Sequence, residues 1–400
     1  MSKRNFPDFI TAYFQYAQDN FCPDKFHFWT GISLIAGALE RKTYIVQDKY
    51  RFYPNLYIML VSGPGMGKSS AMQIGVNGIF NKLDNMNFIP QHITEAKLVE
   101  DLARQKVFYK GNKEFIHSSS YWYISEGSNV LAERKSAGDL IPMITEIYDC
   151  PGVFAKGTKA DGSTKIVNAC LNMLSGVTFD FAKRLILGQN SAGGFSSRNI
   201  YVIHNKVMVR NPHWENMALD TNMQADLIHD LSEINKMVGQ FKLDKDFKQA
   251  YLDWFPVNDK RNQELKSSIL RDFMARNHTN AFKLAQIFSA SESNEMLITK
   301  DHWDKAIDVL TKVNNELPDL IAMGEQAQYG TVGLKHMIVN VIRKHPGVNV
   351  KEIQRLMPFG ADMRFFKDTL EALGASGVLG NTMINGKAGM IVLNDPQDQL

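Results

Sequence analysis

Residues 56–72, LYIMLVSGPGMGKSSAM, join an apolar run to a glycine-rich turn that ends in Lys-Ser and opens a helix. The run 56–61 has the composition of a buried parallel strand. Glycines in the turn let backbone N–H groups approach a polyphosphate closely, and the following helix presents its positive end there. The stretch therefore predicts a phosphate-binding loop made of Gly63, Pro64, Gly65, Met66, Gly67, Lys68 and Ser69.

Two side chains at the end of this loop carry the expected nucleotide chemistry. Lys68 would reach the β- and γ-phosphates and the Ser69 hydroxyl would hold Mg²⁺, so ATP and Mg²⁺ are the predicted cofactors. Ser62 stands where the usual eight-residue pattern begins with glycine, a position that mainly shapes the turn. A glycine-rich turn without a ligand is the alternative interpretation.

Composition narrows the class of protein. The chain has 400 residues, which suggests two or three domains. Lys plus Arg number 45 and Asp plus Glu 42, so any surface that attracts nucleic acid must be local. Three widely spaced cysteines show neither a disulfide framework nor zinc-ligand spacing. Neither a signal-peptide core nor an apolar run of membrane-spanning length is present, so we expect a cytoplasmic protein with no membrane partner.

A second motif, Ser125-Glu126, ends the predicted strand 119–124. Glu126 fits the carboxylate that lies beside Mg²⁺ and activates the attacking water as a general base. Ser125 takes the position of the Asp that usually binds Mg²⁺, and a hydroxyl or a bound water would complete the metal's shell. Alternatively, Glu126 only caps the next helix, because Glu-Gly-Ser-Asn is also plausible turn chemistry.

Residues 151–168 predict a β-hairpin, because Asp-Gly separates two β-like runs. Lys156, Lys159 and Lys165 lie on or beside its turn. A solvated surface hairpin is the ordinary interpretation. The position directly ahead of the predicted strand 169–175 favours a functional one.

Polar residues follow the next two strands. Ser175 or Thr178, at the tip of the strand 169–175, would orient the attacking water. Arg198 ends a glycine-rich stretch and precedes the strand 199–204, and an arginine held there is suited to reach a neighbouring subunit's γ-phosphate.

This ordered set resembles the core of AAA+ ATPases, in the branch of the minichromosome-maintenance-like and superfamily 3 helicases. The lead-in FWTGISLIAGALERK and YPNLYIMLVSGPGMGKS resembles helicase-like ATPases of phages and mobile elements, and the resemblance covers about residues 24–310. It implies an α/β fold, a ring that is commonly a hexamer, and hairpin lysines that grip single- or double-stranded DNA. It also implies that Arg198 acts in trans and that Arg276, or else Arg271, is a second sensor on a helical lid. A solvated helix arginine is the alternative for these two.

The C-terminal part predicts three helices followed by two short strands around residues 385–387, which is the pattern of a winged helix. Arg364 and Lys367 on its third helix and Lys387 on its wing are candidate DNA contacts. Protein binding, for example to a replication partner, is equally open for this fold.

These observations predict a helical N-terminal segment (1–50), an AAA+ αβ core (51–210), a helical lid (211–316), a linker (317–330) and a winged-helix domain (331–400). The predicted function is that of a ring-forming, ATP-dependent DNA helicase or translocase, acting in phage or mobile-element replication inside a bacterial cell. The alternative is an ATP-switched loader that recruits a partner through its winged helix. A nucleotide-dependent nuclease is less favoured, because no cluster of metal-binding carboxylates is evident.

Overall fold

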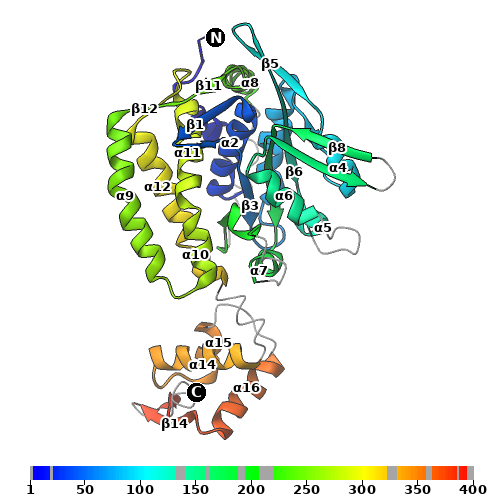
Figure 1. The fold of residues 1–400 in the computed structure, drawn as a ribbon. Helices are drawn as coiled ribbons and strands as arrows, with labels where there is room; N and C mark the ends of the chain where they lie inside the picture. The colour runs from blue at the N-terminus through cyan, green and yellow to red at the C-terminus, as the bar shows by residue number, and fades with distance from the viewer. Residues whose placement is uncertain are drawn as a thin grey trace. The chain divides into compact units, whose positions relative to one another are not determined.

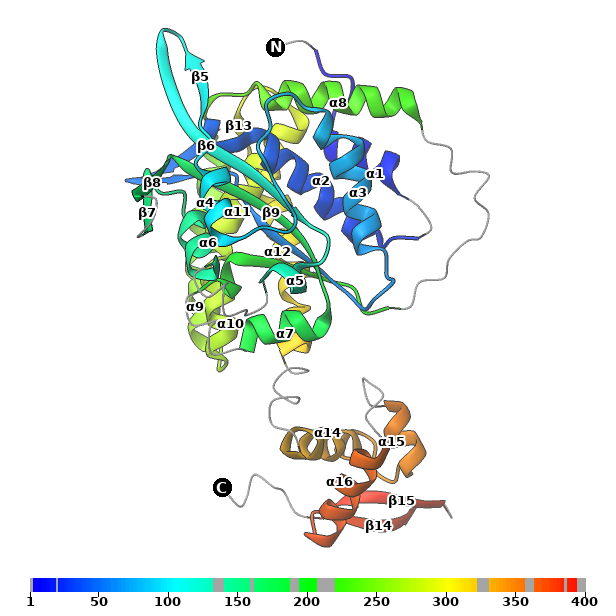
Figure 2. The ribbon, with the colours of Figure 1, turned by 90° about the vertical axis from the view of Figure 1, so that its right-hand side faces the viewer.

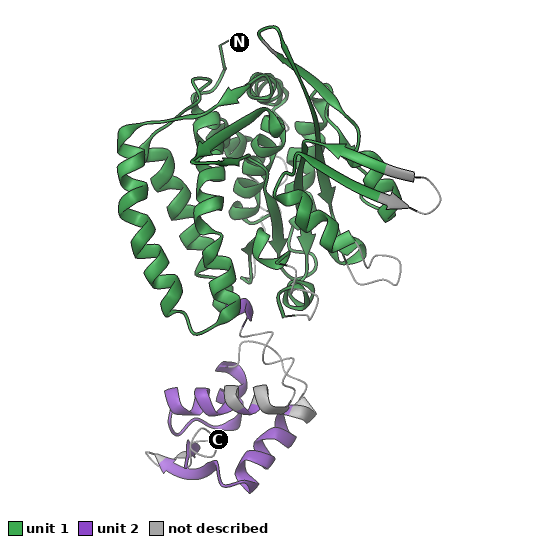
Figure 3. Cartoon of the chain, in the orientation of Figure 1, with its two compact units in different colours: residues 1–318 green, residues 319–400 purple. Residues whose placement is uncertain are grey.

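The computed structural model describes residues 3–18, 21–131, 140–158, 162–187, 194–206, 220–321, 331–356, 363–384 and 387–393. The chain divides into two compact units, residues 1–318 and 319–400 (Figure 3). Each unit is described by itself below.

A parallel sheet forms the centre of the first unit. Its strands lie in the order β10 (Asn199–Ile203), β3 (Tyr57–Val61), β9 (Ala169–Val177), β6 (Lys113–Ile124) and β4 (Phe88–Ile89), and each neighbouring pair is parallel. All residues of β3, β9 and β10 are buried, as expected for strands covered on both faces. The prediction of an α/β fold is confirmed at this level. Because these strands all run in one direction, they end along one side of the sheet and begin along the opposite side. We call the side where they end the carboxyl edge and the side where they begin the amino edge.

Helices cover both faces of this sheet. Figure 2 shows α1 (Phe9–Ala17), α2 (Asp24–Leu39) and α3 (Lys68–Gly78) together on one side, with α6 (Leu140–Tyr148) on the other. Helix α2 is buried at nearly every position, so its apolar character all round reflects a core helix. Short helices α4 (Glu95–Leu102), α5 (Gly127–Leu131) and α7 (Phe179–Leu187) follow β4, β6 and β9. Thr94 caps α4, since its side chain accepts a hydrogen bond from Lys97 N.

Three antiparallel pairs of strands accompany the central sheet among the described residues, and only one of them shares a strand with it. β5 (Lys106–Lys110) pairs with the first half of β6, which is longer than the sequence predicted. The predicted hairpin is present as β7 (Val153–Thr158) and β8 (Gly162–Val167), and its tip, residues 159–161 including Lys159, lies outside the described residues. β1 (Thr43–Gln47) pairs with β2 (Tyr50–Phe52) and, on its other side, with β11 (Gly239–Gln240). Figure 1 shows the β5–β6 and β7–β8 ribbons projecting from the body of the unit.

The predicted lid region is built from α8 (Thr221–Asn235), α9 (Lys245–Glu264), α10 (Ser268–Ala275), α11 (Asn277–Glu292) and α12 (Lys300–Asn314). Helices α10 and α11 meet at Arg276, and the sequence analysis did not anticipate α8 or α9. The two-residue strand β12 (Lys242–Leu243), ahead of α9, pairs in parallel with β13 (Leu297–Ile298), ahead of α12. One hydrophobic core joins buried residues of α1, α2, β3, α11 and α12, so the expected N-terminal, core and lid segments share their packing.

The second unit has its own small core. Helices α14 (Thr331–Lys344), α15 (Val350–Leu356) and α16 (Met363–Ala375) precede an antiparallel pair, β14 (Leu379–Ile384) and β15 (Lys387–Val392). Val348, ahead of α15, forms an additional antiparallel bridge to Met390. The predicted order of three helices and then a hairpin is confirmed.

Candidate functional site

The glycine-rich loop connects the carboxyl end of β3 to the first turn of α3. Gly67 caps α3 with a φ of 77°, in the left-handed region that favours glycine. A Cβ at this position would lie 2.7 Å from the carbonyl oxygen of Phe21 and 2.9 Å from Cys22 Cα. The segment ahead of α2 therefore packs against the loop. The sequence analysis missed this contact, because nothing local links residues 21 and 67.

Lys68 folds back over the loop that precedes it. Its Nζ donates to the carbonyl oxygens of Ser62 (3.0 Å) and Gly63 (2.8 Å) and to Ser62 Oγ (3.1 Å). Burial lowers the pKa of Lys68 below its usual value, against the charge of Glu126, which raises it. The ammonium group is thus held at the mouth of the loop within the field of Glu126. Ser69 follows as the second residue of α3 and is partly exposed.

The ends of β6 and β9 meet the start of α3. A Cβ built on Gly176 would lie 2.7 Å from the Ser125 carbonyl oxygen and 3.6 Å from Lys68 Cβ. Three segments distant in sequence therefore come together at the carboxyl edge, as motifs on neighbouring parallel strands should. Glu126, directly after Ser125, is exposed there.

Ser125 has a partner that the sequence did not reveal. Its Oγ donates to Gln91 Oε1 at 2.6 Å, and its backbone N–H donates to the same atom at 3.3 Å. Gln91 lies just beyond β4, the strand next to β6 in the sheet. No local pattern around Gln91 marks it as a neighbour of Ser125.

The structure separates the two candidates at the tip of β9. Ser175 is fully buried, and its Oγ has no hydrogen-bond partner among the described residues. Thr178 is partly exposed just past the strand, where its Oγ1 accepts from Phe181 N at the start of α7. Of the two hydroxyls, only that of Thr178 lies at a partly exposed residue.

The two predicted arginines converge on a carboxylate that the sequence analysis did not single out. Arg198 Nη2 lies 2.5 Å from Asp149 Oδ2, and Arg276 Nη1 lies 3.7 Å from Asp149 Oδ1. Arg198 Nη1 also donates to the Gly194 carbonyl (3.0 Å), while its buried Nε has no partner among the described residues. The side chain of Asp149 is 51% exposed, against 12% for Arg198, so the cluster opens on the carboxylate side.

This arginine cluster, Arg198, Arg276 and Asp149, lies at the amino edge of the sheet. Arg198 immediately precedes β10, whose first residue pairs with Tyr57, the first residue of β3. The five-residue strand β3 rises about 3.3 Å per residue between that point and the glycine-rich loop. The two arginines and Lys68 of one chain are therefore at opposite ends of β3.

The lysines of the β7–β8 ribbon differ in their surroundings. Lys156 forms an ion pair with Glu95 of α4, whereas Lys165 is exposed. Lys165 pairs with Ala155, so it lies on the opposite face of the ribbon from Lys156. Their side chains therefore do not form one basic face.

In the second unit, Lys367 is exposed on α16 beside the exposed Asp368 and Glu371. The side chains of Arg364 and Lys387 lie outside the described residues. The described part of this helix face is mixed in charge.

Metal, membrane and family comparisons add the following. Among the described residues, no group of three or more His, Cys, Asp or Glu side chains is arranged to hold a metal ion. Within the same residues, every helix is too short or too polar to cross a bilayer.

No protein-family model matches the chain, and no curated protein is significantly similar to it.

Proposed function

We propose that the first unit is a P-loop ATPase core of the AAA+ type and that the protein is a ring-forming, ATP-dependent DNA translocase or helicase. One observation carries the proposal. The strand β9, with its polar tip, lies between the strand that enters the glycine-rich loop and the strand that ends in Ser125-Glu126. That order brings loop, carboxylate and polar tip to one edge of the sheet, where a nucleotide's terminal phosphate would be attacked.

In this proposal, the N–H groups of residues 63–67 surround the β- and γ-phosphates, and Lys68 exchanges its carbonyl partners for phosphate oxygens. The residues fit Mg²⁺, because Ser69 directly follows Lys68, the charge of Glu126 acts on Lys68, and Mg²⁺ often takes only one or two protein oxygen ligands. When bound, the ion would neutralise phosphate charge.

Hydrolysis would use three further side chains. Glu126 takes the proton of the attacking water, and its exposure beside Lys68 suits that role. Thr178 orients the water in preference to Ser175, whose hydroxyl is buried. Arg198, which lies at the opposite end of β3 from Lys68, acts on the nucleotide of a neighbouring copy.

Arg276 is proposed to act beside Arg198 in the same neighbouring site. Both guanidinium groups approach Asp149, so both already face one anion from the same edge. In the assembled ring, a γ-phosphate would take the place of that carboxylate. This assignment differs from a lid arginine that senses the nucleotide of its own chain.

DNA would be gripped through the β7–β8 ribbon, with Lys159 and Lys165 as its phosphate contacts. Lys156 is a weaker candidate, because Glu95 neutralises it. The second unit is proposed to be a winged helix, on the order of its helices and strands and on the extra bridge at Val348. Its mixed charge leaves binding of a replication protein as open as DNA contact through Arg364, Lys367 and Lys387.

Steady-state ATP hydrolysis with and without single-stranded DNA tests the proposal. We expect stimulation by DNA, and a loss of turnover on the order of 10²–10⁴ in Glu126→Gln with nucleotide binding retained. Hydrolysis that is indifferent both to DNA and to Glu126 would contradict the proposal.

An ATP-switched loader is the second candidate, favoured by one observation. The Ser125 hydroxyl, which stands at the usual position of a magnesium carboxylate, is already bonded to Gln91. Slow turnover without unwinding, combined with ATP-dependent binding to a partner protein, would identify this function.

A further inference from the structure

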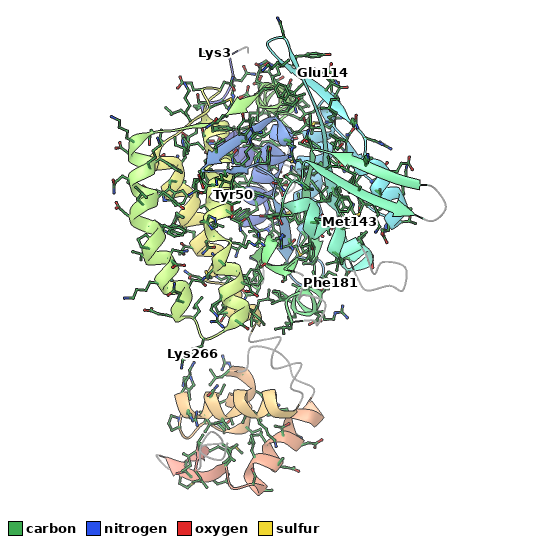
Figure 4. The ribbon with its side chains drawn as sticks, viewed as in Figure 1. Lys3, Tyr50, Glu114, Met143, Phe181 and Lys266 are labelled. Atoms are coloured by element: carbon green, nitrogen blue, oxygen red, sulfur yellow. The ribbon has the colours of Figure 1, made fainter. Side chains whose placement is uncertain are left out.

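A pocket of about 330 Å³ lies at the amino edge of the sheet, away from the glycine-rich loop. The β1–β2 ribbon lines one wall, and the β5–β6 ribbon lines the other. Figure 4 labels Tyr50 at the start of β2 and Glu114 on the projecting β5–β6 ribbon. Asn168, which joins β8 to β9, also lines the pocket, so the pocket lies at the base of the β7–β8 ribbon.

The first wall consists of two arginines stacked on two tyrosines. The guanidinium carbon of Arg41 lies 4.3 Å from the centre of the Tyr53 ring, and that of Arg51 lies 5.0 Å from the centre of the Tyr44 ring. Arg41 is fixed, because its Nη1 donates to the carbonyl oxygens of Cys150 and Ala169, both at 2.6 Å. Arg51 is exposed, and none of the described carboxylates pairs with it. The wall thus offers planar cations already held over aromatic rings.

The second wall is aromatic and partly exposed. Phe108 and Phe115 stack with ring centres 5.2 Å apart and planes 12° apart, and His117 meets Phe108 edge-on at 5.4 Å. Phe115 is 41% exposed, so part of its ring is open to a ligand. Burial lowers the pKa of His117 to about 4, so this ring is neutral at pH 7.

The charge of the pocket lining favours anionic ligands over cationic ones. No Asp or Glu is among the described lining residues, which include Arg41, Lys42 and Arg51. The nearby Glu40 is already paired with Lys42 and Lys106. A ligand suited to this pocket therefore carries negative charge and a flat ring system, and a volume of this size accommodates one such group.

We infer that this pocket binds one unstacked base and its adjacent phosphate, as a unit of a single DNA strand. The inference rests on the proposed function, because the β7–β8 ribbon at whose base the pocket lies is the proposed DNA grip. The base inserts between the aromatic walls, and Arg51 contacts the phosphate. Stacking on aromatic rings accepts any base, so this contact would hold a strand without reading its sequence.

Binding of a fluorescein-labelled oligothymidylate to the full chain, measured by anisotropy across a salt series without ATP, tests this inference. We expect Arg51→Ala and Phe115→Ala each to weaken binding about tenfold. They should differ in salt dependence, because loss of one phosphate contact lowers the slope of log affinity against log salt by about 0.7, whereas loss of a stacking ring leaves it unchanged. Arg184→Ala is the matched control, since Arg184 also lies over a ring, Phe181, but outside the pocket.

The outcomes separate this inference from the proposed function. If the wild-type chain binds no oligonucleotide, both fail together. If it binds and both pocket variants bind equally well, only the pocket is wrong. Thymidine monophosphate, measured by calorimetry in Lys68→Ala, distinguishes a free nucleotide from a strand. Binding of the mononucleotide as tight as that of the oligonucleotide, and dependent on Arg51, would overturn the strand assignment. A loss of affinity that occurs only with a loss of self-association in sedimentation would overturn it too, in favour of a contact between copies.

Discussion

The two edges of the parallel sheet differ in the charged side chains that they carry. At the carboxyl edge, Lys68 and Glu126 lie together around the glycine-rich loop. At the amino edge, Arg198 and Arg276 share Asp149. ATP hydrolysis of the proposed type needs both sets around one phosphate, and a single chain keeps them at opposite ends of β3. We therefore propose that the catalytic unit is a pair of chains, with the carboxyl edge of one facing the amino edge of the next.

Loss of the amino-edge arginine is expected to have the largest effect. Arg198→Ala should bind ATP normally and lose turnover by about 10³-fold or more, because an arginine supplied to the γ-phosphate acts mainly in the transition state. Equilibrium binding of a fluorescent ATP analogue and steady-state hydrolysis measure the two steps. Arg104→Ala, which breaks another arginine–aspartate pair, at 2.6 Å near the end of α4, is the control. Normal hydrolysis by Arg198→Ala would remove the arginine from the mechanism.

The β7–β8 lysines distinguish a DNA contact from a structural ion pair. Lys165→Ala should weaken DNA stimulation of the ATPase several-fold, because Lys165 is exposed. Lys156→Ala should leave DNA stimulation unchanged and cost less than about 1 kcal/mol of unfolding free energy, because its pair with Glu95 is partly exposed. ATPase titrations with DNA and urea unfolding measure these effects. Equal effects of the two variants on DNA stimulation would mean that the β7–β8 ribbon is a solvated surface hairpin and that Lys165 makes no specific contact with DNA.

A substitution of Asp149 tests whether this carboxylate competes with a neighbouring chain's phosphate for Arg198 and Arg276. Asp149→Asn keeps the shape of the side chain and removes the charge that competes with a neighbour's phosphate. We expect ATP turnover at limiting protein concentration to rise by at most about fivefold, since an ion pair that is open to solvent on its carboxylate side is worth up to about 1 kcal/mol. A fall in turnover would mean instead that Asp149 positions the arginines for catalysis.

The last expected effect is on stability instead of turnover, and concerns the pH dependence at the amino edge. The folded-state pKa of His117 is lowered to about 4 by burial, so between pH 4 and 6.5 the unfolded chain binds a proton that the folded chain does not. This contribution to stability is complete above pH 6.5 and declines as the pH falls, by at most about 2 kcal/mol at pH 5. Urea unfolding at pH 7 and pH 5 should therefore differ less in His117→Gln than in the wild type. An identical difference in both proteins would assign the pH dependence to other groups.

Local patterns predicted the carboxyl edge well. The glycine-rich loop, the strand ahead of it and the helix that begins at Lys68 are specified by neighbouring residues, and the Asp-Gly turn specified the β7–β8 ribbon in the same way. The convergence of Asp149, Arg198 and Arg276 was out of reach, because it depends on where three distant segments meet. The same holds for the bond between Gln91 and Ser125.

Other differences have a physical reason in the sequence itself. Helix α9 contains Pro256, a residue that favours a helix end when only the sequence is considered. The pattern of polar and apolar residues in β5 and in the first half of β6 is that of a solvated ribbon, without the apolar run of a core strand. The helical state of α9 and the strand state of β5 and the first half of β6 therefore depend on tertiary packing, which local sequence patterns do not encode.

The most direct test of the paired-chain account is complementation between two inactive variants. Lys68→Ala lacks the carboxyl-edge cation and Arg198→Ala lacks the amino-edge one, so each alone should show almost no ATP hydrolysis. When the two proteins are mixed in equal amounts, about a quarter of the sites in random assemblies would join an intact Lys68 to an intact Arg198, and activity should return to that extent. A mixture as inactive as its components would contradict the account, because it would mean that Lys68 and Arg198 do not act together across two chains.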